Sequence, residues 1–231
     1  MAEITITASD GGSFFAYLAE PKATPAGAVV VIQEIFGVNA AMRATCDWLA
    51  EMGFIAVCPD LFWRIELRID ITDKTQAEWD KAFALFKAFD QDKGILDLKA
   101  TLAAARRLPG ANGKAATMGF CLGGRLAFMM AARSDADANI SYYGVGLEGL
   151  LAEVSAIKAP LLMHIAAGDK FVPPEAQAAI VAGVAANKAI AAHVYLAVEH
   201  AFARVDGVHF DARAATIANG RTAELLARVL G

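Results

Sequence analysis

The hydrophobic pattern changes along the chain from alternation to continuous apolar runs. Residues 4–7 and 14–18 alternate apolar and polar side chains around Asp10-Gly11-Gly12, which predicts a β-hairpin. Residues 28–32 form a continuous, β-branched run, which is typical of a strand buried on both faces. Further buried strands are predicted at residues 54–58, 114–120, 139–143, 160–166 and 193–197.

Helical periodicity fills the intervals between the predicted strands. Helices are expected over residues 40–52, 92–108 and 174–186, after Cys121-Leu122-Gly123-Gly124 up to about residue 133, and at the end of the chain. Two of them show a clear apolar face, formed by Ile95, Leu98, Leu102 and Ala105 in one and by Ile217, Leu225 and Val229 in the other. The alternation of strand and helix predicts an α/β fold with a mostly parallel sheet and helices on both faces.

The segment from about residue 62 to 91 departs from this alternation. Trp79, Phe83, Phe86 and Phe89 recur there at helical spacing and face two directions, so we expect an aromatic helix covered on more than one side. A long insertion with its own helix is typical of a lid or pocket wall. No repeat or low-complexity linker interrupts the chain, so residues 1–231 are interpreted as one domain with this insertion at about 62–91.

Composition and charge exclude several classes of protein. The chain is 57% hydrophobic and 20% charged with a net charge of −4, which provides a core but no basic surface for nucleic acid. No signal peptide and no membrane-spanning stretch is visible, so a cytoplasmic location is expected. The three cysteines are odd in number and lack C-x2-C spacing, so neither a disulfide framework nor a zinc site is predicted.

The strongest chemical signal is the pentapeptide Gly119-Phe120-Cys121-Leu122-Gly123. It matches G-x-S-x-G with cysteine in place of serine, between a predicted strand and a predicted helix. In that setting the central residue sits on a strained turn and exposes its side chain above the sheet, and the helix N-terminus favours a thiolate. The alternative interpretation is a glycine-rich packing turn with a buried cysteine.

Two further residues complete a possible catalytic triad. Asp169 and His200 each follow a predicted strand, and the chain order nucleophile, acid, histidine is the order that this kind of fold uses. Taken alone, such an aspartate is usually a turn residue and such a histidine is usually exposed. All three together predict nucleophilic catalysis by Cys121.

The loop after the strand at residues 28–32 offers the remaining candidates. The backbone N–H groups of Ile35 and Leu122 are the predicted oxyanion-hole donors. Glu34 is interpreted either as an acid packed against the nucleophile or as a structural residue of its loop. His164 inside a strand is expected to be a hydrogen-bonded core residue, and Cys46 and Cys58 are expected to be buried apolar residues.

The sequence resembles the dienelactone hydrolase family (carboxymethylenebutenolidases) over essentially its whole length. The resemblance rests on QEIFGVN, CPDLF, FDQDKG, GFCLGGRLAF, YYGVGLE, GDKFVP and HAFAR. It implies an α/β-hydrolase fold, a triad of Cys121, His200 and Asp169, and cofactor-free hydrolysis of a small-molecule lactone or ester. It also implies that Glu34 accepts the thiol proton when substrate arrives. Oligomeric state is left open, and a monomer is compatible with the sequence.

The same resemblance leads us to expect two arginines around a substrate carboxylate. One corresponds to Arg204, but Trp79 stands where the other is expected, and Phe83 stands where an aromatic hydroxyl is expected. These departures predict a pocket that favours less anionic or more aromatic substrates, with Arg204 as the remaining anchor.

Three other functions compete with lactone hydrolysis. One is a broad-specificity carboxylesterase or a hydrolase of another lactone, to be decided by the aromatic insertion. Another is a non-catalytic ligand-binding protein on the same fold, which a complete triad disfavours. The last is a thiol redox protein, for which no resolving cysteine lies near Cys121 in the sequence.

Overall fold

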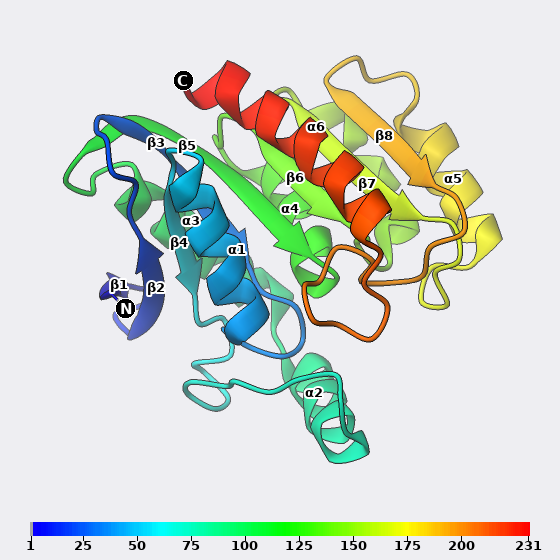
Figure 1. Cartoon of the computed structure of the whole chain (residues 1–231), viewed down its shortest axis with the longest axis horizontal. Coiled ribbons are helices and arrows are strands. Elements are labelled where there is room, and N and C mark those ends of the chain that lie inside the picture. Colours follow the sequence, from blue (N-terminus) through cyan, green and yellow to red (C-terminus); the bar gives the residue numbers. More distant parts are fainter. Residues whose placement is uncertain (1) are drawn as a thin grey trace.

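The computed structural model describes residues 2–231, which form an eight-stranded sheet flanked by helices (Figure 1). The strand order is β1-β2-β4-β3-β5-β6-β7-β8. Strands β1 (Ala2–Thr7) and β2 (Ser13–Ala19) form the predicted antiparallel hairpin, and β2 also pairs antiparallel with β4 (Ile55–Pro59). All other neighbouring strands are parallel, so the predicted α/β fold class is confirmed.

The remaining strands lie close to their predicted positions. They are β3 (Ala26–Ile32), β5 (Ala111–Phe120), β6 (Asn139–Tyr142), β7 (Leu161–Ala166) and β8 (Ile190–Tyr195). The last one ends two residues before its predicted end, because Ala197 adopts a φ of 58°, which a strand does not tolerate.

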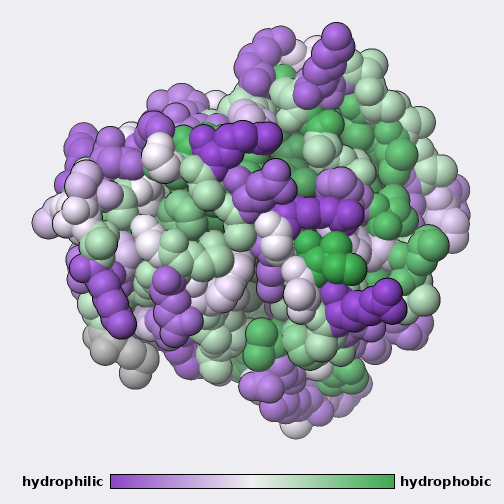
Figure 2. All heavy atoms as spheres, turned by 45° about the horizontal axis from the view of Figure 1, so that its top comes forward, coloured by the Kyte–Doolittle hydropathy of each residue, from purple (hydrophilic) through white to green (hydrophobic). Residues whose placement is uncertain are grey.

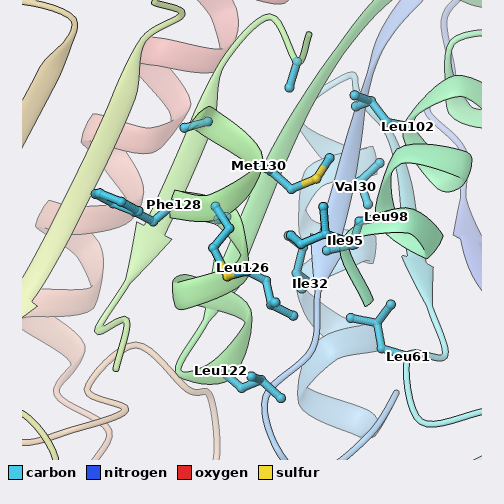
Figure 3. Packing of buried hydrophobic residues seen from close by; sticks show 14 of the residues in the cluster. Val30, Ile32, Leu61, Ile95, Leu98, Leu102, Leu122, Leu126, Phe128 and Met130 are labelled. Atoms are coloured by element: carbon cyan, nitrogen blue, oxygen red, sulfur yellow. The ribbon is translucent and has the colours of Figure 1, made fainter. Parts of the chain in front are cut away.

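Two hydrophobic cores lie on the two faces of the sheet, and β3 contributes to both. Val30 and Ile32 join the core beneath α3 (Gln91–Ala105), α4 (Leu122–Arg133) and α5 (Pro174–Val184), as Figure 3 shows for α3 and α4. Val29 and Val31 point to the other core, beneath α1 (Ala40–Glu51) and α6 (Ala212–Leu230). This period of two explains why the whole run is hydrophobic.

Three details of the helices differ from the sequence predictions. Helix α2 (Gln76–Ala88) ends before Phe89, whose ψ of 121° turns the chain away, so Phe89 is not part of the aromatic helix. In α6, Ile217 is 45% exposed because the buried row runs through Ala214, Ala218 and Leu225, one position away from it. The 3-10 helix η1 (Leu147–Ala156) was not predicted.

No helix within residues 2–231 is both long enough and apolar enough to cross a bilayer. Figure 2 shows one face of the molecule, on which hydrophobic side chains are interspersed with hydrophilic ones. Helix α2 lies beyond the ends of the sheet strands, on the side where the loop after β8 also passes (Figure 1).

Candidate active site

Cys121 occupies a strained turn between β5 and α4. Its φ of 56° and ψ of −115° lie outside the regions that non-glycine residues normally adopt. The strand and helix cross so closely that a Cβ on Gly119 would lie 2.0 Å from the carbonyl oxygen of Gly123. A Cβ on Gly123 would lie 2.2 Å from the carbonyl oxygen of Ile32. Both glycines are therefore required by the crossing that lifts Cys121 above the sheet.

Asp169 and His200 meet at the carboxyl ends of β7 and β8. His200 Nδ1 donates to Asp169 Oδ2 at 2.6 Å, and the backbone N–H of Phe171 donates to Asp169 Oδ1 at 2.8 Å. Both side chains are buried. The other ring nitrogen of His200, Nε2, has no hydrogen-bond partner among the described residues. Because Asp169 fixes Nδ1, this free nitrogen is available for proton transfer.

The electrostatics of His200 depend on its two neighbours. Burial by itself disfavours a charged imidazole, but the thiolate form of Cys121 and the carboxylate of Asp169 outweigh burial and raise the pKa of His200 to about 10. Negative charge on these two neighbours therefore favours the charged form of His200. The structure brings Cys121 and His200 to the wall of one cavity, with Asp169 behind the histidine.

Glu34 is engaged by an arginine. Arg204 Nε donates to Glu34 Oε2 at 2.5 Å, and Arg204 Nη2 donates to Glu34 Oε1 at 3.0 Å. Arg204 Nη1 donates to Asp73 Oδ2 at 2.5 Å, so this buried guanidinium faces two carboxylates. No hydrogen bond joins Glu34 to Cys121 among the described residues. The role of Glu34 as the acceptor of the thiol proton therefore stays a prediction.

A cavity of about 280 Å³ opens above Cys121 and is mostly apolar. Its wall includes Ile35, Phe36, Trp79, Phe83, Phe86 and Phe171. Trp79 stacks on Phe83 with ring centroids 5.4 Å apart, and its indole N–H donates to the Asp73 carbonyl at 3.0 Å. The indole N–H is therefore already committed within the protein.

The aromatic helix α2 is a cavity wall rather than a helix covered on several sides. Phe83 is 45% exposed and Phe86 is 38% exposed, whereas only Ala82 and Leu85 of this helix are buried. The expectation that several sides would be covered is wrong, because the aromatic side chains face the open cavity instead of a second layer of protein.

A model of the dienelactone hydrolase family matches residues 14–230. The chain belongs to the dienelactone hydrolase family. It is 54% identical over 232 residues to an Azospirillum brasilense protein provisionally named carboxymethylenebutenolidase, and the match covers 100% of both chains. It is 45% identical to carboxymethylenebutenolidase 1 of Cupriavidus pinatubonensis, over 97% of this chain and 95% of that one.

A solved structure agrees with this family membership. A provisionally named dienelactone hydrolase from Klebsiella pneumoniae superposes with a TM-score of 0.83 at 27% identity, covering 99% of this chain and 100% of that one. The predicted α/β-hydrolase fold is therefore confirmed, and so is the prediction that the chain is an enzyme, a carboxylic ester hydrolase of the dienelactone hydrolase family.

The two predicted oxyanion donors belong to a residue of the cavity wall and to the residue that follows the cysteine. Ile35 lines the cavity, and the amide of Leu122 opens helix α4 directly after Cys121. Neither N–H group donates to another group among the described residues. Ile35 lies in the turn that follows β3, and Leu122 is the first residue of its helix, where backbone N–H groups have no partner within the helix. Their role as oxyanion donors stays a prediction.

Three polar residues at the site were missed by the sequence analysis. Asp73 lies in a loop and Arg125 lies in helix α4. No sequence pattern marks either of them as a functional residue. Tyr143 follows β6 at a φ of 38°, and its ring packs edge-on against His200 with centroids 5.0 Å apart. Its buried hydroxyl has no partner among the described residues, and burial together with Glu34 raises the pKa of Tyr143 well above its usual value. Its position at a strand end is the signal that could have found it.

The remaining histidine and cysteine predictions agree with the structure. His164 is buried and pairs with the Tyr195 hydroxyl at 2.9 Å and the Thr222 hydroxyl at 3.1 Å, so it is a core residue. Cys46 and Cys58 are fully buried. Within residues 2–231, no group of three or more His, Cys, Asp or Glu side chains is arranged to hold a metal ion.

Proposed function

We propose that this chain hydrolyses an enol lactone or activated ester through a thioester on Cys121. The observation that carries this proposal is the strained placement of Cys121 at the cavity wall, beside a histidine whose Nδ1 is held by Asp169 at 2.6 Å. A thiolate is the reactive form of cysteine, and the raised pKa of His200, to about 10, favours it.

The reaction divides into two acyl transfers. The Cys121 sulfur attacks the lactone carbonyl carbon, and the carbonyl oxygen takes up negative charge between the amides of Ile35 and Leu122. Collapse breaks the bond to the ring oxygen, leaves a thioester, and passes the proton of His200 to the released enolate. His200 then removes a proton from water, and the resulting hydroxide cleaves the thioester to yield the acid and restore the thiolate.

The substrate class follows from the nucleophile and the cavity. A thiolate suits carbonyl compounds with good leaving groups, such as enol lactones and activated esters, and suits alkyl esters and amides poorly. A cavity of about 280 Å³ fits a small molecule, and its aromatic wall suits a planar, conjugated one. The relative from Cupriavidus pinatubonensis, a carboxymethylenebutenolidase by name, makes carboxymethylenebutenolide the first lactone to test.

A broad-specificity carboxylesterase is the second candidate function. It is favoured by the apolar wall and by the exposure of Phe83 and Phe86, which leaves the cavity open to varied acyl groups. The two candidates differ in leaving-group dependence and in their preference for a ring, which a panel of lactones and activated esters separates.

Cys121→Ala and Cys121→Ser test the mechanism. Both variants are expected to fold, because each changes only the small side chain of one residue at the cavity wall, whose exposed fraction is 9%. Both should lose hydrolysis by several orders of magnitude. The wild-type enzyme is mixed with excess lactone, quenched in acid and digested. Mass spectrometry should then show the mass of the acyl group on the peptide that contains Cys121. Turnover by Cys121→Ala near the wild-type rate contradicts the proposal.

A further inference from the structure

The cavity wall holds an arginine that the proposed mechanism does not use. Arg125 lies in the first turns of α4, four residues after Cys121, and therefore about 6 Å further along the helix axis. Its backbone N–H donates to the Cys121 carbonyl at 3.0 Å. The helix thus fixes the spacing between the nucleophile and this cation.

Three hydrogen bonds hold the Arg125 guanidinium in one position. Nε donates to the Gln91 side-chain oxygen at 2.6 Å, and Nη1 donates to the carbonyls of Val145 at 3.3 Å and Gly146 at 2.5 Å. All these partners line the same cavity. Gly146 suits this position, because its φ of 64° favours glycine and a Cβ would lie 2.6 Å from Arg125 Nη1 and displace the guanidinium. Such a guanidinium is pre-organised, since its side-chain entropy has already been lost.

The third nitrogen of this guanidinium has no acceptor among the described residues. Arginine carries five N–H donors, and the two on Nη2 of Arg125 are not used by any hydrogen bond of residues 2–231. Nη2 of Arg125 is accessible from outside the protein. It is not among the fully buried polar side-chain atoms that lack a hydrogen-bond partner, which are Arg106 Nε, Asn139 Nδ2, Tyr143 Oη and His200 Nε2 within residues 2–231. It can therefore donate to a molecule in the cavity.

Arg125 also lacks a counter-ion. Within residues 2–231, no carboxylate oxygen lies within 4.0 Å of its guanidinium, and Glu148 and Glu153 act on it only from a greater distance. Burial lowers the pKa of Arg125, whereas the hydrogen-bonded Glu153 raises the pKa of Arg133 on the same helix. Arg125 has therefore lost water without gaining an anion, and an anionic ligand restores the balance.

The other arginine of the cavity, Arg204, already has carboxylate partners. Arg204 is 6% exposed and faces both Glu34 and Asp73. Its charge is already matched by two carboxylates, so a third carboxylate gains little there while those pairs persist. The unmatched positive charge of the cavity therefore lies at Arg125 and not at Arg204, which the sequence analysis expected to be the anchor. This charge argues against the less anionic substrates that Trp79 led us to expect.

We propose that Arg125 is the substrate-binding residue that holds a carboxylate of the substrate, through Nη2, while Cys121 attacks the carbonyl one helical turn away. The inference rests on the proposed hydrolase function and names its substrate class: small lactones or esters that carry a carboxylate opposite the scissile bond. The aromatic side chains of α2 and Phe171 then contact the flat body of the molecule between its two ends.

The test compares ring opening of carboxymethylenebutenolide with that of its methyl ester, followed by the loss of the conjugated lactone absorbance. The wild type should prefer the acid. Arg125→Gln should lower kcat/KM for the acid roughly tenfold to a hundredfold and change it little for the ester, because one charge-assisted hydrogen bond is lost. Arg125→Lys should keep part of the preference. Arg133→Gln removes the same charge from the same helix outside the cavity and should leave the preference unchanged.

The ratio between the two substrates separates recognition from folding. If Arg125→Gln only loosens the cavity, it lowers both rates equally, and the inference is overturned; a wild type that prefers the ester overturns it too. Calorimetric binding of the acid to Cys121→Ala and to Cys121→Ala/Arg125→Gln supplies a readout that needs no turnover. If Cys121→Ala still hydrolyses the lactone while binding depends on Arg125, the cysteine mechanism fails and the carboxylate site stands. If Cys121→Ala is inactive and binding ignores Arg125, the site fails alone.

Discussion

At the scale of single residues, the site is organised by which charges have partners. Arg204 is matched by Glu34 and Asp73, His200 by Asp169, and Arg125 by no carboxylate within ion-pair distance among the described residues. A buried ion pair that loses one partner leaves an uncompensated charge in a medium of low dielectric constant. Substitutions in this group should therefore change the electrostatic potential at Cys121 as well as stability.

Glu34→Gln is predicted to shift the alkylation of Cys121 to lower pH. The change removes one of the two carboxylates on Arg204, so the remaining positive charge favours the thiolate. The midpoint of the rate of iodoacetamide alkylation should fall by on the order of one pH unit. The variant should also lose roughly 3–5 kcal/mol of stability, so the rates are measured where circular dichroism shows it folded.

Glu199→Gln is the matched control for this shift. Glu199 precedes His200 in the chain but pairs at the surface with Lys170 and His209, both at 3.4 Å, outside the Arg204 cluster. Its neutralisation should leave the alkylation profile nearly unchanged, because solvent screens the lost charge. If Glu34→Gln and Glu199→Gln give the same profile as the wild type, Glu34 only supports its loop.

The roles of single residues are only partly readable from the sequence. Cys121 stands in a pentapeptide whose glycines are tied to the geometry of one turn, so a local pattern identifies it. Asp73 lies in a loop, 131 residues before Arg204, and no local pattern predicts the ion pair between the two residues. Arg125 looks like an ordinary polar helix residue, because its lack of a partner is a property of the folded cavity.

At the scale of elements, the site depends on how closely β5 and α4 can cross. Leu122 and Leu126 of α4 pack into the core beside Ile32 (Figure 3), which draws the start of the helix onto β3. The backbone of Gly123 contacts the carbonyls that end β3, so the first helical turn lies directly on the sheet. The strain at Cys121 is maintained by this packing.

Gly123→Ala is therefore predicted to damage both stability and the turn. The new methyl group would lie 2.2 Å from the Ile32 carbonyl oxygen, so the helix must move away from the sheet. The expected loss is roughly 1–3 kcal/mol or more in urea unfolding, with a slower alkylation of Cys121. Gly220→Ala, in α6 where a Cβ meets nothing within 4 Å, should instead gain roughly 0.5–1 kcal/mol. Equal effects of the two substitutions would contradict this account of the crossing.

The sequence predicted the elements better than their exact faces. A short β-branched run such as Val29 to Ile32 indicates a strand buried on both faces, and the structure has a strand there. Phe89 and Ile217 have the spacing of a helix face, yet one lies past the end of its helix and the other faces solvent. Periodicity defines a face only to within one residue, and the tertiary contacts decide which residue is buried.

At the scale of the whole molecule, the parallel sheet is what collects the site. Glu34, Cys121, Tyr143, Asp169 and His200 follow β3, β5, β6, β7 and β8, and these strands are consecutive in the sheet. Their carboxyl ends share one edge, so residues spread over more than half of the chain meet there. The sequence predicts this gathering through the order of strands, but the size and charge of the resulting cavity follow only from the packed structure.

The stability of the whole chain is predicted to fall below pH 6.5 because of one buried histidine. His164 in β7 hydrogen-bonds to Tyr195 of β8 and Thr222 of α6, and it stacks on His193 with centroids 6.4 Å apart. Burial, with smaller effects of His193 and Arg221, lowers the pKa of His164 to about 3. Between pH 6.5 and 3 the unfolded chain binds a proton that the folded chain does not, so stability decreases as the pH falls.

The size of this effect can be separated from the titration of carboxylates. From pH 7 to pH 5, where most carboxylates remain ionised, the linkage of His164 alone contributes a loss of about 2 kcal/mol of unfolding free energy. The raised pKa of His200 offsets part of this loss, because the folded chain keeps that proton throughout the interval. His164→Gln should show a clearly smaller slope over this interval in urea unfolding, whatever its absolute stability. His209→Gln, which changes a histidine that is 45% exposed, should keep the wild-type slope. An unchanged slope in His164→Gln would mean that this histidine is not the group whose protonation opposes folding, and that the acid sensitivity arises elsewhere in the chain.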